Sequence, residues 1–358
     1  MSYRINVIGA GPAGLFSAAS IKILLPSADV QIFERNPKES LSTGLGYTFI
    51  PQTLSYLQHF GGKFIDDITR DNPRWNTVSI LSESGMMTQR ISAHNYVGIP
   101  RKKLMHALDN LVAGLEIPTT YNAEITNENI SDFTKTDLTI IATGVKRFLS
   151  PEAARPFTIF ETESPMHYAW FEFPITVSDL SVSIDRTTSV PYLMHAYPFA
   201  KDTSAFVVEV LGQNVAAFCN EFGFDQQKTK KAFLTPDLFS QARLRGSQRP
   251  LHENMLLLGD AGCTPYFHTG AGLNTAFYVA HNLAKAIATP AKTLPERLTL
   301  FAATQGDYYH KMFTQSVDLL NRNLRVLQTF DSLDESDRVL LVTGKGLDGM
   351  ATSPTIKL

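Results

Sequence analysis

The sequence is poor in cysteine, in excess charge and in long apolar runs. Its two cysteines, Cys219 and Cys263, are too distant for a metal motif and too few for a disulfide framework, which fits a reducing cytoplasm. Lysine and arginine number 32 against 34 acidic residues, so a net charge of −2 gives no reason to expect a nucleic acid partner. No apolar run reaches transmembrane length, and the first strand-like run starts too early to leave room for a signal peptide.

The catalytic residue patterns of several enzyme classes are also missing from the sequence. The sequence contains no pattern resembling a hydrolytic triad, a metal cluster or a phosphate-transfer loop. A hydrophobic content of 44% over 358 residues is ample for a large globular core. Any chemistry is therefore expected to come from a bound cofactor.

Residues 3–36 carry the pattern of a dinucleotide site. The apolar run 3–8 indicates a buried parallel strand, and a helix-length segment follows it and stops near Pro26. A second apolar run, 30–33, ends at Glu34, twenty residues after Gly14. A carboxylate at this spacing reaches a ribose hydroxyl, so the frame favours a dinucleotide site over a glycine-rich turn of another α/β protein.

The glycines between these elements form G-x-G-x-x-G, and each has a physical role. Gly9 permits the tight strand-to-helix turn, and Gly11 lets a pyrophosphate touch the backbone. Gly14 lets the helix pack closely on the strand, so that the helix N-terminus can take the phosphate charge.

A second glycine-opened helix near residues 255–287 indicates a longer cofactor than NAD. A buried strand over 255–258 ends at Asp260, whose carboxylate can accept hydrogen bonds from ribityl hydroxyls. Gly270 and Gly272 open a helix whose amides and dipole can face a developing negative charge on a flavin ring. An enzyme that uses only NAD has no need of this second site.

With these motifs, the chain resembles the single-component FAD-dependent aromatic hydroxylases, which are flavoprotein monooxygenases. The resemblance is strongest to the branch of salicylyl-CoA and aminobenzoyl-CoA hydroxylases and the violacein-pathway indole hydroxylase. Matching stretches are VIGAGPAGL with IFERN, GLGYTF at 44–49, VGIPRKKLMHAL at 97–108, LMHAYPFAKDTSAFVVE at 193–209 and GDAGCTPYFHTGAG at 259–272. Phe267 stands where most of the wider family has proline.

The resemblance implies an α/β fold: a Rossmann-like FAD-binding domain, an inserted mainly antiparallel β-sheet substrate domain and C-terminal helices. The strand-rich insertion between two nucleotide-binding segments points the same way. The expected boundaries are 1–72 with 93–150 and 246–295 for the FAD-binding domain, 73–92 with 151–245 for the substrate domain, and 296–358 for the C-terminal region. Residues 41–60 are expected to form a glycine-rich turn and an amphipathic helix, 73–92 a hairpin, and 294–330 one or two helices.

The resemblance and the motifs together predict the cofactor contacts. Arg101 at a helix start is unfavourable for the dipole, which an anion beside it would explain. Thr143 departs from the family, where many members have aspartate, so the turn is kept and the charge is lost. The predicted FAD-binding residues are Gly9, Gly11, Ala13, Gly14, Glu34, Arg35, Gly46, Arg101, Thr143, Gly144, Asp260, Gly270 and Gly272.

Substrate contacts are predicted on the inserted sheet. His195 and Tyr197 share one strand face, because side chains repeat every two residues, and Tyr47 lies near the ring by resemblance. A hydrogen-bonded core histidine and a packed aromatic remain equally open readings. Trp170, Phe171 and Phe173 either line an aromatic pocket or pack in the core, which is the safer reading. No residue is assigned as securely catalytic.

By resemblance, the function is hydroxylation of an aromatic substrate through a C4a-hydroperoxyflavin, using NADH or NADPH and O2. The branch suggests a fused indole-type or an aryl-CoA substrate, and Arg147, Lys201, Arg243 and Arg245 are candidates to meet a CoA group. The protein is expected to be a cytoplasmic monomer or homodimer. Alternatives are a flavin-linked reductase of the same fold and a non-catalytic FAD-binding protein. A halogenase is disfavoured because W-x-W-x-I-P is absent.

Overall fold

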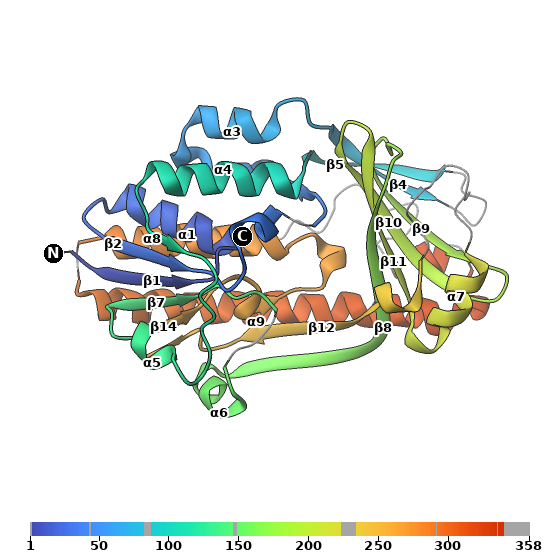
Figure 1. Cartoon of the computed structure of the whole chain (residues 1–358). Coiled ribbons are helices and arrows are strands. Elements are labelled where there is room, and N and C mark those ends of the chain that lie inside the picture. Colours follow the sequence, from blue (N-terminus) through green and yellow to red (C-terminus); the bar gives the residue numbers. More distant parts are fainter. Residues whose placement is uncertain are drawn as a thin grey trace.

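Two β-sheets organise the part of the chain that the structure describes (Figure 1). The structure is a computed structural model and describes residues 2–42, 44–81, 87–145, 149–222, 234–290, 292–334 and 336–339. The six-stranded sheet has the order β13-β14-β7-β1-β2-β6, and its strands are parallel except for the β13–β14 pair. The strands are β1 (Arg4–Ile8), β2 (Asp29–Phe33), β6 (Thr119–Thr120), β7 (Leu138–Ile141), β13 (Leu251–His252) and β14 (Met255–Leu257).

The nine-stranded sheet is antiparallel except where β4 pairs with β9. Its order is β15-β12-β8-β11-β10-β9-β4-β5-β3. The strands are β3 (Tyr47–Phe49), β4 (Arg74–Leu81), β5 (Met87–Ile99), β8 (Ile159–Phe173), β9 (Leu180–Arg186), β10 (Pro191–Ala200), β11 (Thr203–Leu211), β12 (Ser240–Ser247) and β15 (Cys263–Thr264). The expected α/β architecture with an inserted antiparallel sheet is confirmed.

Helices α1 and α8 pack side by side against the six-stranded sheet, and α4 packs on α1 (Figure 1). The long α9 runs past both sheets and contacts α8 and β12. The helices are α1 (Pro12–Leu24), α2 (Pro51–Ser55), α3 (Gly62–Thr69), α4 (Arg101–Gly114), α5 (Ile130–Phe133), α6 (Pro151–Ala154), α7 (Val215–Glu221), α8 (Gly272–Ala288) and α9 (Leu294–Gln328). None of the helices in the described ranges combines the length and the apolar character needed to cross a bilayer.

Most of the expected elements are present, and one differs. The run 41–60 is not a turn followed by one amphipathic helix: it contains β3, the short α2 and a 3₁₀ turn over Gln58–Phe60. Pro51 fixes the start of α2, and residues 47–49 pair with β5 instead of coiling. The region 294–330 forms one long helix.

Strand β5 continues beyond the hairpin predicted for 73–92 and ends at Ile99, directly before α4. The domain boundaries themselves stay a prediction. The turn of the hairpin, near residues 83–85, lies outside the described residues, as do Arg147 and the tail after residue 339.

The nine-stranded sheet is fixed near the nucleotide-binding part where β5 crosses β10. A Cβ added at Gly98 would lie 2.2 Å from the Pro198 carbonyl oxygen and 2.7 Å from the Phe199 Cα. Both are backbone atoms of a paired strand, so they cannot move aside cheaply.

We expect Gly98→Ala to lower the free energy of unfolding by about 1–3 kcal/mol, because the two strands must separate to admit a methyl group. Gly114→Ala is the matched control, since a Cβ there, at the end of α4, meets nothing within 4 Å. Chemical denaturation of both variants measures the difference. Equal stability of the two variants would contradict the close approach.

Candidate functional site

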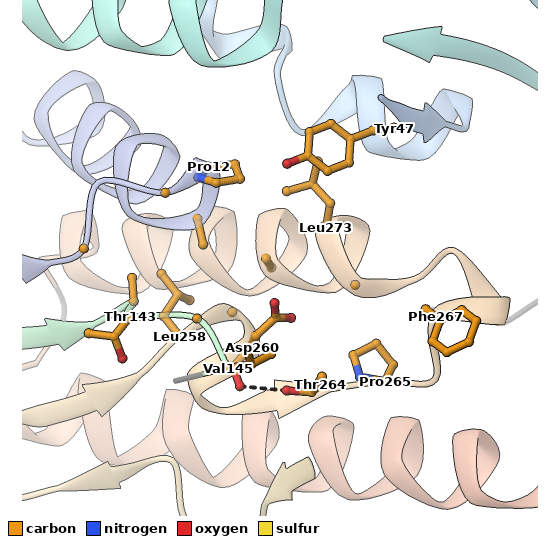
Figure 2. Close-up of a pocket in the computed structure, with 18 of the residues that line it drawn as sticks. Pro12, Tyr47, Thr143, Val145, Leu258, Asp260, Thr264, Pro265, Phe267 and Leu273 are labelled. Carbon is orange, nitrogen blue, oxygen red and sulfur yellow. Dashed lines mark hydrogen bonds between the residues drawn. The ribbon is translucent and has the colours of Figure 1, made fainter. Parts of the chain in front are cut away.

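A cavity of about 1110 Å³ lies between the six-stranded sheet and the inner face of the nine-stranded sheet. Figure 2 shows Pro12, Tyr47, Asp260 and Phe267 around it, contributed by segments far apart in the sequence. The volume exceeds the range of roughly 300–1,000 Å³ that is typical of a small-molecule pocket. It is large enough for an extended ligand together with a second molecule.

Two helix N-termini open onto this cavity. Helix α1 begins after Gly11 and α8 after Ala271, and neither N-cap residue has a side chain that could accept from the first helix amides. The first amides of a helix have no partner inside the helix, so a ligand can accept from them and gain from the dipole. A Cβ added at Gly11 meets nothing within 4 Å, so the backbone there faces open space. This is the geometry that a pyrophosphate needs, and it fits the expected FAD.

The carboxylate of Glu34 is held in place at the end of β2. Its Oε2 accepts from the Ala10 amide at 2.8 Å, and its Oε1 accepts from the amide and side chain of Asn36 at 2.9 and 2.7 Å. Each carboxylate oxygen has more than one lone pair, so the group can still accept from a ribose hydroxyl. The structure therefore fixes its orientation toward the cavity, and the ribose contact stays a prediction.

Asp260 faces the cavity from the turn after β14 (Figure 2). Burial raises the pKa of this carboxyl from 3.8 to about 6, although the charges of Arg245 and Arg101 oppose the rise. Its backbone carbonyl accepts from the Thr264 hydroxyl at 2.9 Å, which orders the turn. A desolvated carboxylate beside an open cavity gains from hydroxyl donors, so it fits the ribityl contact that the sequence predicts.

Arg101 provides an unused donor on the same side. Its guanidinium donates through Nη1 to the hydroxyl of Tyr47, whereas its buried Nε has no hydrogen-bond partner in the described structure. Burial raises the pKa of Tyr47, so that hydroxyl stays neutral. A buried cationic donor without a partner is costly, and a phosphate or hydroxyl of a cofactor would satisfy it.

Most of the predicted site residues gather at this cavity. Its lining includes Gly9, Gly11, Ala13, Glu34, Arg35, Tyr47, Arg101, Thr143, Gly144, His195, Tyr197, Asp260, Gly270 and Gly272. Gly14 and Gly46 do not line it. Gly14 packs against the backbone of Gly9, as its predicted role requires, and Gly46 packs against Phe199. Whether these residues bind FAD is a prediction that geometry supports and binding must test.

The nine-stranded sheet contributes an aromatic wall. Trp170 lines the cavity with 44% of its surface exposed, whereas Phe171 and Phe173 pack around Phe206 on the opposite face of β8. Of these three aromatic residues, Trp170 therefore lines the pocket, and Phe171 and Phe173 pack in the core. Tyr197 lines the cavity as well, but its hydroxyl donates to the Gly46 carbonyl at 2.9 Å and links β10 to the loop before β3.

His195 meets two residues that the sequence did not single out. Its Nδ1 lies 3.9 Å from Oε1 of the fully buried Glu209, and His268 Nδ1 lies 3.0 Å from the same oxygen. Burial, together with the nearby His268, holds the pKa of His195 well below its usual range, so its ring is neutral. His195 belongs to a polar group in the cavity wall, and not to an ordinary apolar core.

Sequence reasoning missed two parts of the site, the buried Glu209 behind the cavity wall and one lining segment, and only Glu209 carried a signal. Glu209 stands in the apolar run SAFVVEV, where a buried acid between valines needs an explanation. The lining segment 123–128 lies in a loop after β6 and matches no motif, so its place became visible only through the fold.

Comparison with known proteins gives sequence relatives and fold relatives. No protein-family model matches the chain. It is 24% identical over 325 residues to a salicyloyl-CoA 5-hydroxylase of Streptomyces, covering 83% of this chain and 61% of that protein. It is 25% identical over 311 residues to protodeoxyviolaceinate monooxygenase of Chromobacterium violaceum, covering 80% of each. The chain thus spans about three fifths of the first relative.

Solved structures share the fold at lower identity. The tetrameric form of 2-methyl-3-hydroxypyridine-5-carboxylic acid oxygenase aligns with a TM-score of 0.73 and 14% identity, over 96% of both chains. CtdE, solved in complex with FAD and a substrate, aligns with a TM-score of 0.69 and 14% identity, over 94% of this chain and 92% of that one.

We expect Gly11→Val to fold normally and to lose FAD, because its side chain would enter the open space at the α1 N-terminus where the pyrophosphate must touch the backbone. Flavin absorbance per mole of purified protein measures the loss. Gly62→Val is the control, since a Cβ there also meets nothing within 4 Å but lies on α3. A fully loaded Gly11→Val protein would refute the site.

We expect Asp260→Asn to stabilise the FAD-free protein while weakening FAD binding. The folded protein holds the Asp260 proton more tightly than the unfolded chain does, so stability falls as pH rises from about 4 to about 6 and stays lower above that. The Asn side chain would carry no charge, so the variant avoids the cost of ionising a buried carboxyl, which lowers the free energy of unfolding by up to about 3 kcal/mol.

Losing a charge-assisted acceptor should in turn weaken FAD binding about ten- to a hundredfold. Thermal unfolding against pH without FAD, and titration with FAD at neutral pH, measure the two opposite effects on one variant. Unchanged FAD affinity would mean that Asp260 only orders its turn.

Proposed function

Because the chain belongs to the FAD-dependent aromatic monooxygenase family, we propose that it hydroxylates an aromatic substrate with FAD, O2 and NADH or NADPH. One observation carries the proposal: a single cavity joins a dinucleotide-binding side to an aromatic wall. The binding side presents two helix N-termini, Asp260 and the partnerless Nε of Arg101. The wall comes from the nine-stranded sheet. A non-catalytic flavoprotein would share the first half and would not need the second.

The protein's own tasks follow from the residues in place. When bound, FAD supplies the redox and oxygen chemistry. With FAD bound, the α1 N-terminus and Gly11 would hold the pyrophosphate, Glu34 would orient the adenosine ribose, and Asp260 and Arg101 would hold the ribityl region. The N-terminus of α8 would stabilise negative charge on the flavin.

The sheet side orients the substrate and excludes water. Trp170 offers an exposed indole face, and Tyr168 and Phe267 pack together with ring centroids 4.3 Å apart. Flat apolar walls hold an aromatic ring by offset or edge contacts. Correct placement matters because a displacement on the order of 1 Å costs about a hundredfold in rate.

We infer a substrate larger than a simple phenol, either a fused indole-type compound or an aryl-CoA. The named relatives act on substrates of these two kinds, and the cavity volume leaves space beyond a cofactor. Among the candidates for a CoA contact, Arg243 lines the cavity with a side chain 69% exposed, and it pairs with Glu163 at 3.1 Å. Arg245 pairs with Glu161 and is largely buried.

The test supplies FAD-loaded protein with NADPH or NADH, ¹⁸O2 and a panel of indole and aryl-CoA compounds. We expect one compound to gain a single labelled oxygen at a rate above the substrate-free rate of NAD(P)H oxidation. A product reduced by two hydrogens and free of label would identify a reductase. Bound FAD without NAD(P)H oxidation under any condition would indicate a non-catalytic flavoprotein.

A further inference from the structure

A fully buried carboxylate lies behind the cavity wall. Glu209 of β11 has no exposed surface, and its Oε1 is 3.0 Å from Nδ1 of His268. Its Oε2 accepts from the hydroxyl of Tyr266. His268, in the 3₁₀ turn over Phe267–Thr269, and His195 of β10 both line the cavity, so this acid is linked to the substrate side through imidazole rings.

The carboxylate has no permanent positive partner in the described structure. The cations within ion-pair distance of Glu209 are His268 and, at 3.9 Å, His195, and both are charged only when protonated. A buried negative charge without a counter-charge is costly, so a proton added to a neighbouring imidazole neutralises the pair. A proton taken up by His268 would therefore lie beside a carboxyl oxygen 3.0 Å from its ring.

The surrounding hydrogen bonds assign the donors. The side-chain amide of Asn323 on α9 donates to the hydroxyl of Tyr266 at 3.0 Å, so the Tyr266 proton goes to Glu209. Burial and the Glu209 charge raise the pKa of Tyr266 far above its usual value, which keeps that proton in place. An ionised Glu209 can only accept, so Nδ1 of His268 carries its ring proton, and Nε2 is left with a lone pair.

His195 completes the cluster. Its ring meets that of His268 edge-on, with centroids 4.9 Å apart, and its buried Nδ1 has no hydrogen-bond partner among the described residues. Titratable groups that face His268 are Glu209 from β11, His195 from β10 and Tyr266 ahead of the turn, while α9 contributes the neutral Asn323. The cluster thus has one buried carboxyl group and two imidazoles.

We propose that His268, oriented by its hydrogen bond to Glu209, accepts the proton of a hydroxyl or ring N–H group on the aromatic substrate. The inference rests on the proposed function and deepens it. It favours a substrate whose aromatic part is neutral before binding, because Arg243 is the only guanidinium among the sheet-side lining residues described, and it is exposed and paired. An aromatic carboxylate would find no buried cation there.

The proton transfer balances within the pair. The substrate X–H bond breaks, its electron pair stays on X, and an N–H bond forms at Nε2 of His268. The ring becomes an imidazolium beside the Glu209 carboxylate, so the buried pair becomes neutral overall while the substrate becomes an electron-rich anion. Reverse transfer from Nε2 returns the proton to X in the product. His268 is then a catalytic residue, and Glu209 is a positioning residue.

The first test reads ionisation directly with 4-nitrophenol, whose phenolate absorbs in the visible. 4-Nitrophenol is added to FAD-loaded protein at a pH below the pKa of free 4-nitrophenol, so that the unbound compound stays un-ionised. We expect a phenolate band on binding to the wild-type protein and its loss in both His268→Asn and Glu209→Gln. His106→Asn, a change at an exposed site on α4, should keep the band. If Glu209→Gln does not fold, Tyr266→Phe tests the orientation of the Glu209 carboxyl instead, because it removes the hydroxyl that donates to Oε2.

The second test reads the tautomer by ¹⁵N NMR of histidine-labelled, FAD-loaded protein. We expect His268 with a proton on Nδ1 and none on Nε2, and a change of that pattern in Glu209→Gln. The inference is overturned if 4-nitrophenol binds un-ionised or does not bind, if His268→Asn keeps the band, or if the tautomer is reversed. A stoichiometric divalent metal in the purified protein would also overturn it, since the metal would occupy the lone pairs.

Different results would refute the monooxygenase function and the proton-acceptor role of His268. A phenolate band without any labelled oxygen in products leaves the proton acceptor in place and removes the monooxygenase function. Labelled product at equal rates from wild type and His268→Asn, without a band, keeps the function and removes the proton acceptor.

Discussion

The close approach of Gly14 to Gly9 is the constraint on which the binding side depends. A Cβ at Gly14 would lie 1.9 Å from the Gly9 carbonyl oxygen, so only glycine lets α1 settle on β1 at this depth. That position aims the α1 N-terminus at the cavity. It also places Phe16 of α1 against Phe277 of α8, with stacked rings 4.3 Å apart. The second helix N-terminus is thereby positioned by the first.

The substrate wall is fixed to this frame at a few backbone contacts. Gly98 lets β5 cross the backbone of Pro198, and the hydroxyl of Tyr197 donates to the Gly46 carbonyl. Helix α9 adds a third link, because Gly306 lies so close to Gln248 that a Cβ would come within 2.0 Å of its carbonyl oxygen. A wall held by backbone contacts keeps its distance from the opposite side of the cavity, and the proposed hydroxylation would require that precision.

The sequence predicted what local patterns determine. Gly9, Glu34 and Asp260 each lie just after a strand of the six-stranded sheet, where the geometry is local, and all three line the cavity. The loop 123–128 and the Glu209–His268 pair were not predicted, because they depend on which distant strands become neighbours. Pairing of β10 with β11 and the placement of η7, the 3₁₀ turn Phe267–Thr269, bring residues some sixty positions apart into contact, and no spacing rule contains that information.

Two buried acids, Asp260 in the cavity lining and Glu209 behind the cavity wall, show how one fold treats the same group in two ways. Asp260 is desolvated with its pKa raised to about 6, and it is open to the cavity, so it gains by accepting from a ligand's hydroxyls. Glu209 is fully buried and already accepts from Tyr266 and His268, so it has nothing to gain from direct ligand contact. Its charge acts instead through an imidazole that does reach the cavity. The first arrangement suits binding and the second suits proton transfer, because only a satisfied, immobile carboxylate can hold a ring in one tautomer.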